Sequence, residues 1–146
     1  MPVSSHGRVP RANIDPILTV EDAMAVFDLA ISHPLAAETI VMFLDREFRG
    51  SCLVTVTETD DPIQVVAIAE AMALSASHEP DITGIVLATV RPGGTMLDDD
   101  DDVWFEASDV VDSAGLTLID WLIIGRGGTT SPRQQLGLNS RWPSGL

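Results

Sequence analysis

The sequence contains no lysine and only one cysteine, Cys52. Without lysine, catalysis through a Schiff base or a lysine general base is excluded. A single cysteine also excludes an intrachain disulfide framework and a metal site built from several thiolates. No apolar run approaches the roughly 20 residues that span a membrane, and the first ten residues, MPVSSHGRVP, lack the apolar segment of a secretory signal. We therefore expect a cytoplasmic protein with no membrane partner.

Positive charge is scarce in the middle of the chain. The 146 residues include 22 acidic and 8 basic ones, which gives a formal net charge of -14. All 22 acidic residues but only three of the arginines lie between Ala12 and Gly125, so this body has a net charge of -19. Such a charge repels the phosphates of nucleic acids, and we expect no direct nucleic-acid binding. The arginines at the two ends can lie on the acidic body itself or on an acidic partner.

Hydrophobic spacing divides the chain into three parts. We predict a flexible N-terminal arm over residues 1–18, a folded domain over 19–125 and a flexible basic tail over 126–146. Within the domain, the expected helices cover about 19–31, 60–77 and 99–113, and the expected strands cover 39–44, 51–57, 82–90 and 116–124. The first two strands are expected to form an antiparallel hairpin, and the apolar third strand to be central. The predicted fold class is therefore α/β, in the order α-β-β-α-β-α-β.

Three segments resemble the RadC-like JAB (JAMM/MPN) domain family. Residues 41–45, VMFLD, followed by Arg49 are similar to the family's first strand and turn, and residues 84–88, GIVLA, to the strand that leads to its metal motif. Residues 115–125, GLTLIDWLIIG, resemble the closing strand, in which an Asp-His pair precedes three aliphatic residues and a glycine. The resemblance covers about residues 15–128. It implies a mixed β-sheet flanked by helices, in the deaminase-like three-layer JAB/MPN architecture.

The resemblance also implies a zinc hydrolase site, but this sequence lacks its histidines. In active members, two histidines of an H-x-H-P-x-G motif and the aspartate of a later S-x-x-D bind zinc, and an upstream glutamate activates the metal-bound water. The motif reads Thr89-Val90-Arg91-Pro92-Gly93-Gly94 here. Thr89 is a poor zinc ligand, and Arg91 places a permanent positive charge at the metal position. We therefore expect no metal, no cofactor and no catalytic residue of this family.

The other positions of the metal motif are carboxylates whose alignment stays open. The family's aspartate falls on Asp102 when counted forward from the motif's proline, and on Asp100 when counted back from the closing strand. The family's glutamate falls near Ala37 or Glu38. We predict that Arg91 forms a structural ion pair with Asp100 or Asp102 in place of the metal.

Three other candidate sites have ordinary structural explanations. The aspartates from Asp98 to Asp102 lack the glycine and glutamate of an EF-hand loop and are typical of a solvated helix start, although weak binding of a divalent cation stays open. The glycine-rich segment 125–131 lacks the lysine and the following helix of a phosphate loop. The histidines have no spacing that suits a metal site and are expected at the surface: His6, His33 and His78.

Cys52 and Trp121 are predicted to pack rather than to react. Cys52 lies in the predicted hairpin and is expected to be a small buried hydrophobe. Trp121 stands where the family has the histidine that follows the aspartate, which indicates that packing replaces a polar group there.

These observations predict a catalytically inactive RadC-like JAB domain that acts as a protein-binding or assembly module. A protein partner or self-association is expected, and no small-molecule substrate. The candidate partner anchors are apolar and arginine residues of the tail: Leu136, Leu138, Trp142, Arg126, Arg133 and Arg141. Two alternatives stay open, a metal-dependent peptidase or isopeptidase with an altered site and an acidic protein that mimics the charge of DNA.

Overall fold

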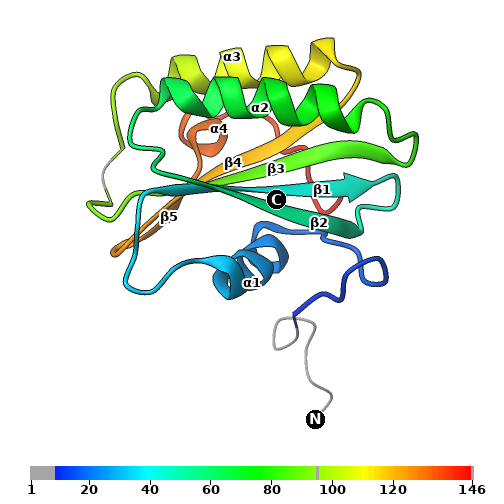
Figure 1. Ribbon diagram of the computed structural model, residues 1–146, viewed down its shortest axis with the longest axis horizontal. Coiled ribbons are helices and arrows are strands. Elements are labelled where there is room, and N and C mark those ends of the chain that lie inside the picture. Colours follow the sequence, from blue (N-terminus) through cyan, green and yellow to red (C-terminus); the bar gives the residue numbers. More distant parts are fainter. Residues whose placement is uncertain (1–8, 95, 146) are drawn as a thin grey trace.

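The computed structural model of the chain describes residues 9–94 and 96–145. Residues 1–8, which include His6 and the start of the predicted arm, lie outside the described residues, as do Thr95 and Leu146. Five strands form one mixed sheet in the spatial order β2-β1-β3-β4-β5 (Figure 1). The strands are β1 (Glu38–Asp45), β2 (Gly50–Thr57), β3 (Ile82–Val90), β4 (Thr117–Gly125) and β5 (Gly128–Thr130).

The pairing of the strands explains their hydrophobic patterns. β1 pairs antiparallel with both β2 and β3, β3 runs parallel to β4, and the short β5 pairs antiparallel with β4. β3 therefore lies in the middle of the sheet, and its residues from Gly84 to Val90 are all buried. Burial on both faces accounts for its continuous apolar run. β2 forms one edge of the sheet, and none of its residues is fully buried.

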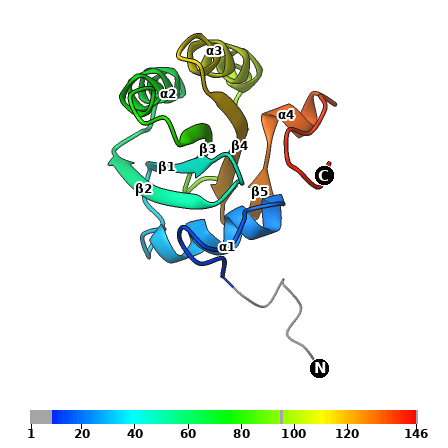
Figure 2. The same ribbon diagram turned by 90° about the vertical axis from the view of Figure 1, so that its right-hand side faces the viewer.

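Helices cover both faces of the sheet, so the fold has three layers (Figures 1 and 2). α2 (Ile63–Ala76) and α3 (Asp100–Ser113) lie side by side on one face, and α1 (Val20–Ala30) lies on the other. The core between the sheet and α2 and α3 includes the large side chains Phe43, Leu87, Trp104 and Trp121. The core between the sheet and α1 includes Phe27, Ile40, Met42 and Leu122.

Polar residues stabilise the N-terminal ends of α1 and α3. The Thr19 hydroxyl accepts a hydrogen bond from the backbone N–H of Asp22 at 3.0 Å and caps α1. The first turn of α3 contains Asp100, Asp101 and Asp102, where the helix dipole stabilises negative charge. Among the described residues, no helix combines the length and the hydropathy that a membrane span needs.

The structure confirms the predicted α/β class, with a mixed sheet flanked by helices. The specific JAB/MPN architecture stays a prediction. The observed order is α-β-β-α-β-α-β-β-α, because β5 and the short helix α4 (Pro132–Gln135) follow β4. Both lie in the segment predicted to be a flexible tail, where the sequence analysis expected no helix or strand, and β5 is the edge strand of the sheet beside β4.

The turn between β1 and β2 is built on Asp45. Its Oδ1 accepts hydrogen bonds from the backbone N–H groups of Glu47 and Arg49, both at 2.9 Å, and its Oδ2 accepts one from Arg49 Nε at 2.8 Å. Burial raises the pKa of the Asp45 carboxyl, but these hydrogen bonds and the Arg49 charge outweigh burial and hold the pKa below its usual range. The hairpin turn is therefore stabilised most when Asp45 is ionised.

Cys52 corrects one prediction, because its side chain is exposed and not buried. It lies in the edge strand β2 opposite Phe43 of β1. There it lines a cleft of about 770 Å³ between the hairpin turn and the end of α2. The pairing of β2 with β1 places Cys52 beside Phe43, but the position of β2 at the edge of the sheet leaves Cys52 exposed.

Candidate functional site

The end of β3 and the start of α3 bring together Arg91 and Asp100. Arg91 Nη1 lies 2.7 Å from Asp100 Oδ2, and Arg91 Nη2 lies 2.8 Å from Asp100 Oδ1. The Asp100 side chain is fully buried, and the Arg91 side chain is 13% exposed. The backbone N–H of Leu97 also donates to Asp100 Oδ2, at 2.7 Å. This bidentate salt bridge therefore links the loop after β3 to the first turn of α3.

Buried hydroxyl groups lie next to this pair. The Trp121 Nε1 donates a hydrogen bond to the Thr89 hydroxyl at 2.9 Å. The Thr39 hydroxyl shares hydrogen bonds with Thr89 at 3.1 Å and with Thr59 at 3.0 Å. The Arg91 guanidinium carbon lies 5.8 Å from the centre of the Trp121 ring, within the range of a cation–π contact. Trp121 thus connects the ion pair to the three threonines.

Glu38 does not join the Arg91 site. Its Oε1 accepts a hydrogen bond from the Ser32 hydroxyl at 2.8 Å, and its Oε2 accepts one from the Ser32 backbone N–H at 2.9 Å. Glu38 and Thr39 are neighbours in β1, so their side chains point to opposite faces of the sheet. The buried Glu38 carboxylate therefore holds the loop after α1.

The remaining motif positions and histidines are at the surface. Asp102 is exposed on α3, as are Asp98 and Asp99 before it. His33 and His78 are exposed as well. Within residues 9–94 and 96–145, no group of three or more histidine, cysteine, aspartate or glutamate side chains is arranged to hold a metal ion. Of the two partners left open for Arg91, the structure places Asp100 against it.

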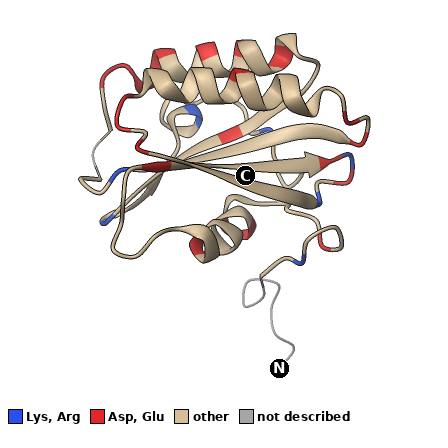
Figure 3. Cartoon of the chain, viewed as in Figure 1, with Lys and Arg blue, Asp and Glu red and all other residues tan. Residues whose placement is uncertain are grey.

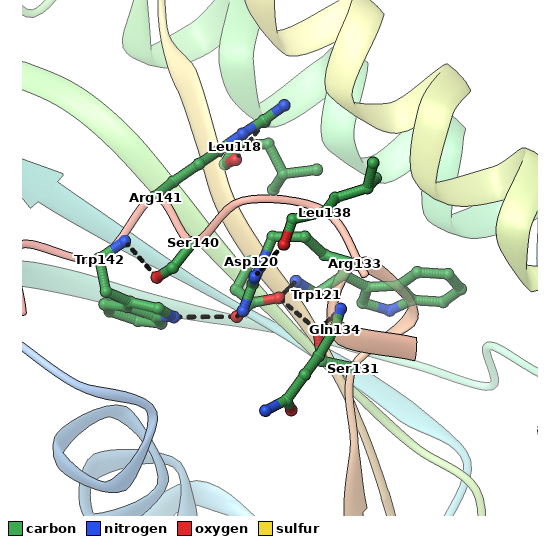
Figure 4. Close-up of polar contacts among 10 residues, drawn as sticks. All are labelled: Leu118, Asp120, Trp121, Ser131, Arg133, Gln134, Leu138, Ser140, Arg141 and Trp142. Carbon is green, nitrogen blue, oxygen red and sulfur yellow. Dashed lines mark hydrogen bonds and ion pairs between the residues drawn. The ribbon is translucent and has the colours of Figure 1, made fainter. Parts of the chain in front are cut away.

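A second buried carboxylate, Asp120 in β4, was not predicted as a site (Figure 4). Its side chain is fully buried. Oδ1 accepts hydrogen bonds from the Ser131 hydroxyl at 2.7 Å and from the Trp121 backbone N–H at 3.0 Å. Oδ2 accepts from Arg133 Nη2 at 3.0 Å and from Trp142 Nε1 at 2.9 Å. Three of these four donors come from the segment after β4, so Asp120 fixes that segment to the sheet.

These contacts correct the role predicted for several tail residues. Arg133 and Trp142 are each only 3% exposed, because this chain already buries them. Arg141 Nη1 donates to the Leu118 carbonyl at 2.8 Å and to the Ser108 hydroxyl at 2.9 Å, and its guanidinium lies over Trp104. These three residues anchor the tail to its own domain, which buries Arg133 and Trp142, whereas Arg141 stays exposed.

The other predicted anchors differ in exposure. Leu136 packs against the core under α2 and α3, whereas Leu138 and Arg126 are exposed. The charge distribution allowed the basic tail to lie on the acidic body. The ion pair between Arg133 of the tail and Asp120 of the body is such a contact. Flexibility of the remaining tail residues stays a prediction.

The polar groups of the Arg91 site bond to one another. The cleft of about 770 Å³ lies elsewhere, beside Ile82 at the start of β3. The lining of the cleft carries arginines and carboxylates together and holds none of the motif positions. Arg49 in this lining is paired with Asp45 and Glu47.

No family model matches the chain, and no curated protein matches it significantly. The resemblance to the RadC-like JAB domain therefore stays a prediction.

Proposed function

We propose that this chain is a non-enzymatic protein-binding or assembly module. The observation that carries the proposal is an exposed apolar face on α2. Ile63 and Leu74 are 65% and 55% exposed, and Ala67 and Ala71 between them are exposed too. Their spacing of i, i+4, i+8 and i+11 puts all four on one side of the helix, beside the exposed Glu70. Exposed apolar residues grouped in this way are typical of sites that bind other proteins.

The Arg91–Asp100 pair supports the non-enzymatic part of the proposal. If the chain is a degenerate JAB domain, this pair lies where the zinc of active members would bind. Arg91 offers no lone pair to a metal, and Asp100 is already bonded to Arg91 and to the Leu97 backbone. A catalytic centre would thus have become a structural ion pair.

Metal content tests this part of the proposal. We expect elemental analysis of the full chain, purified without a histidine tag or chelator, to find no stoichiometric zinc. About one zinc per chain, the occupancy of a single tetrahedral site, would overturn the non-enzymatic proposal. That result would favour a metal-dependent peptidase or isopeptidase.

Affinity capture tests the binding part. The full chain, tagged and expressed in cells that naturally contain it, should retain a protein in near-equal amount after cross-linking and stringent washing. Sedimentation of the purified chain reports self-association in parallel. A chain that is monomeric and retains no protein would contradict the proposal.

The alternative of a DNA mimic is less well supported. Mimicry needs carboxylates gathered on one surface, but acidic residues also lie on α1, on the opposite side of the sheet from α3, and at the hairpin turn (Figure 3). On α1 they include the exposed Glu21 and Asp28. We therefore retain one proposed function.

A further inference from the structure

α2 is apolar on nearly every side, although only one side faces the core. Glu70 is the only charged residue among its 14 residues. The core-facing side contains Val65, Ile68, Ala69, Ala73 and Ala76. A helix that is hydrophobic all round is normally covered all round. The opposite side, formed by Ile63, Ala67, Ala71 and Leu74 and called the α2 face below, is exposed, and no described residue covers it. The exposed Glu70 lies beside Ala67 and Leu74 at the edge of this face.

The border of the α2 face is acidic (Figure 3). α3, which lies beside α2, contains no basic residue. Its exposed carboxylates are Asp102, Glu106, Asp109 and Asp112. Further exposed acidic residues precede and follow α2: Asp60, Asp61, Glu79 and Asp81. Asp109 and Asp112 line a hollow with Arg141, and Glu79 and Asp81 line a cleft with Arg46 and Arg49. A partner that covers the α2 face therefore meets negative charge mainly from Asp60 and Asp61 before α2 and from Asp102 and Glu106 on α3.

The arginines of this chain that contact α3 are already engaged. Arg91 is paired with Asp100 at the start of the helix. Arg141 is bonded to Ser108 and to the Leu118 carbonyl. Neither arginine lies at Asp102 or Glu106 in these contacts, so charge complementarity at this part of the border favours a positively charged occupant.

A second copy of the chain is a poor occupant of the α2 face. Two copies that paired through this face would bring their α3 carboxylates toward one another. Like charges placed together across an interface oppose association. The basic end of this chain is a poor occupant too, because Arg133 and Arg141 are held at β4 and α3.

We propose that the α2 face binds a basic amphipathic helix of a partner protein. The inference rests on the binding function proposed above and names the surface and the class of partner. The first and last of the four residues are 11 residues apart, a length of about 16 Å at the rise of an α-helix. A helix of three or more turns lying along α2 would place its apolar side on Ile63 and Leu74. Its arginine or lysine side chains would then face the carboxylates of α3.

Fluorescence anisotropy with the full chain tests the proposal. The probe is a labelled synthetic peptide of about 20 residues, long enough to form a helix, with leucines along one side and arginines on the flanks. We expect Leu74→Glu to weaken binding of this peptide about tenfold or more, because it removes apolar contact area. The matched control is Leu29→Glu, which changes an exposed leucine of α1 on the other side of the sheet and should leave binding unchanged.

Charge-reversal variants distinguish the effect of the acidic residues beside the α2 face from the effect of the net charge of the chain. The double variant Asp102→Lys, Glu106→Lys should weaken binding, and high salt should weaken binding to the unchanged chain. The double variant Glu21→Lys, Asp28→Lys on α1 has the same net charge and should bind as the unchanged chain does. Equal losses in both double variants would overturn the proposal, because the peptide would then respond only to total charge.

Two further results would also overturn the proposal. One is equal binding of a peptide with the same charge but no leucines. The other is a dimer of the unchanged chain that Leu74→Glu dissociates, because a second copy would then be the occupant.

Cellular capture distinguishes failure of this inference from failure of the proposed function. If the unchanged chain and the Leu74→Glu variant retain the same protein equally, the α2 face is the wrong surface but the binding function stands. If the unchanged chain retains no protein and is monomeric, both proposals fail. Selective loss of a basic partner from Leu74→Glu, with retention by Leu29→Glu, is the supporting result.

Discussion

The two buried aspartates of β4 and α3 each pair with an arginine, yet they are bonded differently. Asp100 accepts two hydrogen bonds from the guanidinium of Arg91, whose side chain stays partly exposed to solvent. Asp120 receives one hydrogen bond from Arg133, whose side chain is only 4% exposed, and depends on Ser131 and Trp142 for its other side-chain donors. The Nε of Arg133 has no hydrogen-bond acceptor within the described part of the chain. The negative charge of Asp100 is therefore matched mainly by one nearby arginine, whereas the carboxylate of Asp120 is stabilised by donors from several positions after β4.

The difference shows how an ion pair can have two structural uses. Arg91 and Asp100 are nine residues apart and close one loop. Asp120 collects donors from positions 11, 13 and 22 residues later, so it organises the whole segment that follows β4. Loss of Asp120 should consequently disturb more of the molecule than loss of Arg91.

The largest effect is expected for Asp120→Ala. The variant leaves Arg133 buried without its counter-charge, and breaking a buried pair in this way costs about 3–5 kcal/mol. Urea unfolding followed by circular dichroism measures the loss. The control Asp109→Ala removes an exposed carboxylate from α3 and should change stability by less than about 0.5 kcal/mol. A stable Asp120→Ala variant would show that Asp120 is not the centre of the segment.

Arg91→Ala should have a smaller effect, a loss of about 2 kcal/mol. Asp100 stays buried in this variant but keeps the hydrogen bond from Leu97 and its place in the first turn of α3. The same unfolding measurement applies, with the exposed Arg126→Ala as control. A loss that exceeds the loss of Asp120→Ala would reverse the comparison.

Trp142→Phe tests the contribution of a single hydrogen-bond donor to Asp120. Phenylalanine keeps most of the apolar contact but removes the Nε1 group that donates to Asp120 Oδ2. We expect a loss of about 1 kcal/mol, the usual cost of one buried hydrogen bond. Hydrogen exchange should show faster opening confined to the residues after β4. Unchanged exchange there would mean that packing of the ring alone holds the segment.

Asp45 and Arg49 extend the comparison to a pair nearer the surface, where Arg49 is 39% exposed. The pKa of Asp45 is lowered, so its contribution to stability is complete above the pKa of the unfolded chain and is lost as pH falls through the lowered value. Asp45→Asn should reduce stability at neutral pH and make the acid side of the stability curve less steep. Unfolding titrations between neutral and strongly acidic pH test this, and parallel curves for the two proteins would contradict it.

Local patterns were enough to predict much of the fold. The capping residue Thr19 and the helical spacing after it define α1, and the continuous apolar run 82–90 matches the buried centre of the sheet. The hairpin follows from two strands joined by a short polar turn. These features depend on neighbours in sequence, which a single sequence displays directly.

The candidate site was predicted only where the family resemblance aligned its residues. Arg91 and an aspartate of the next helix were expected to pair because both fall on positions of the family's metal motif, and the structure pairs Arg91 with Asp100. The Asp120 contacts were missed because Ser131, Arg133 and Trp142 lie in a segment without hydrophobic periodicity. The one signal was a carboxylate within the apolar run of β4, which requires buried donors from somewhere. The exposure of Cys52 depends on β2 being an edge, which alternation along a strand cannot reveal.

The bonding of Asp120 also has a consequence for synthesis of the chain. A ribosome completes β4 before any of the side-chain donors to Asp120 exists, and Trp142 is made 22 residues after the aspartate. Until that residue emerges, burial of β4 would enclose a carboxylate with too few donors, so the nascent strand is better left hydrated. We expect the domain to close late in translation, and a chain interrupted after Gly125 to be a substrate for chaperones and proteases.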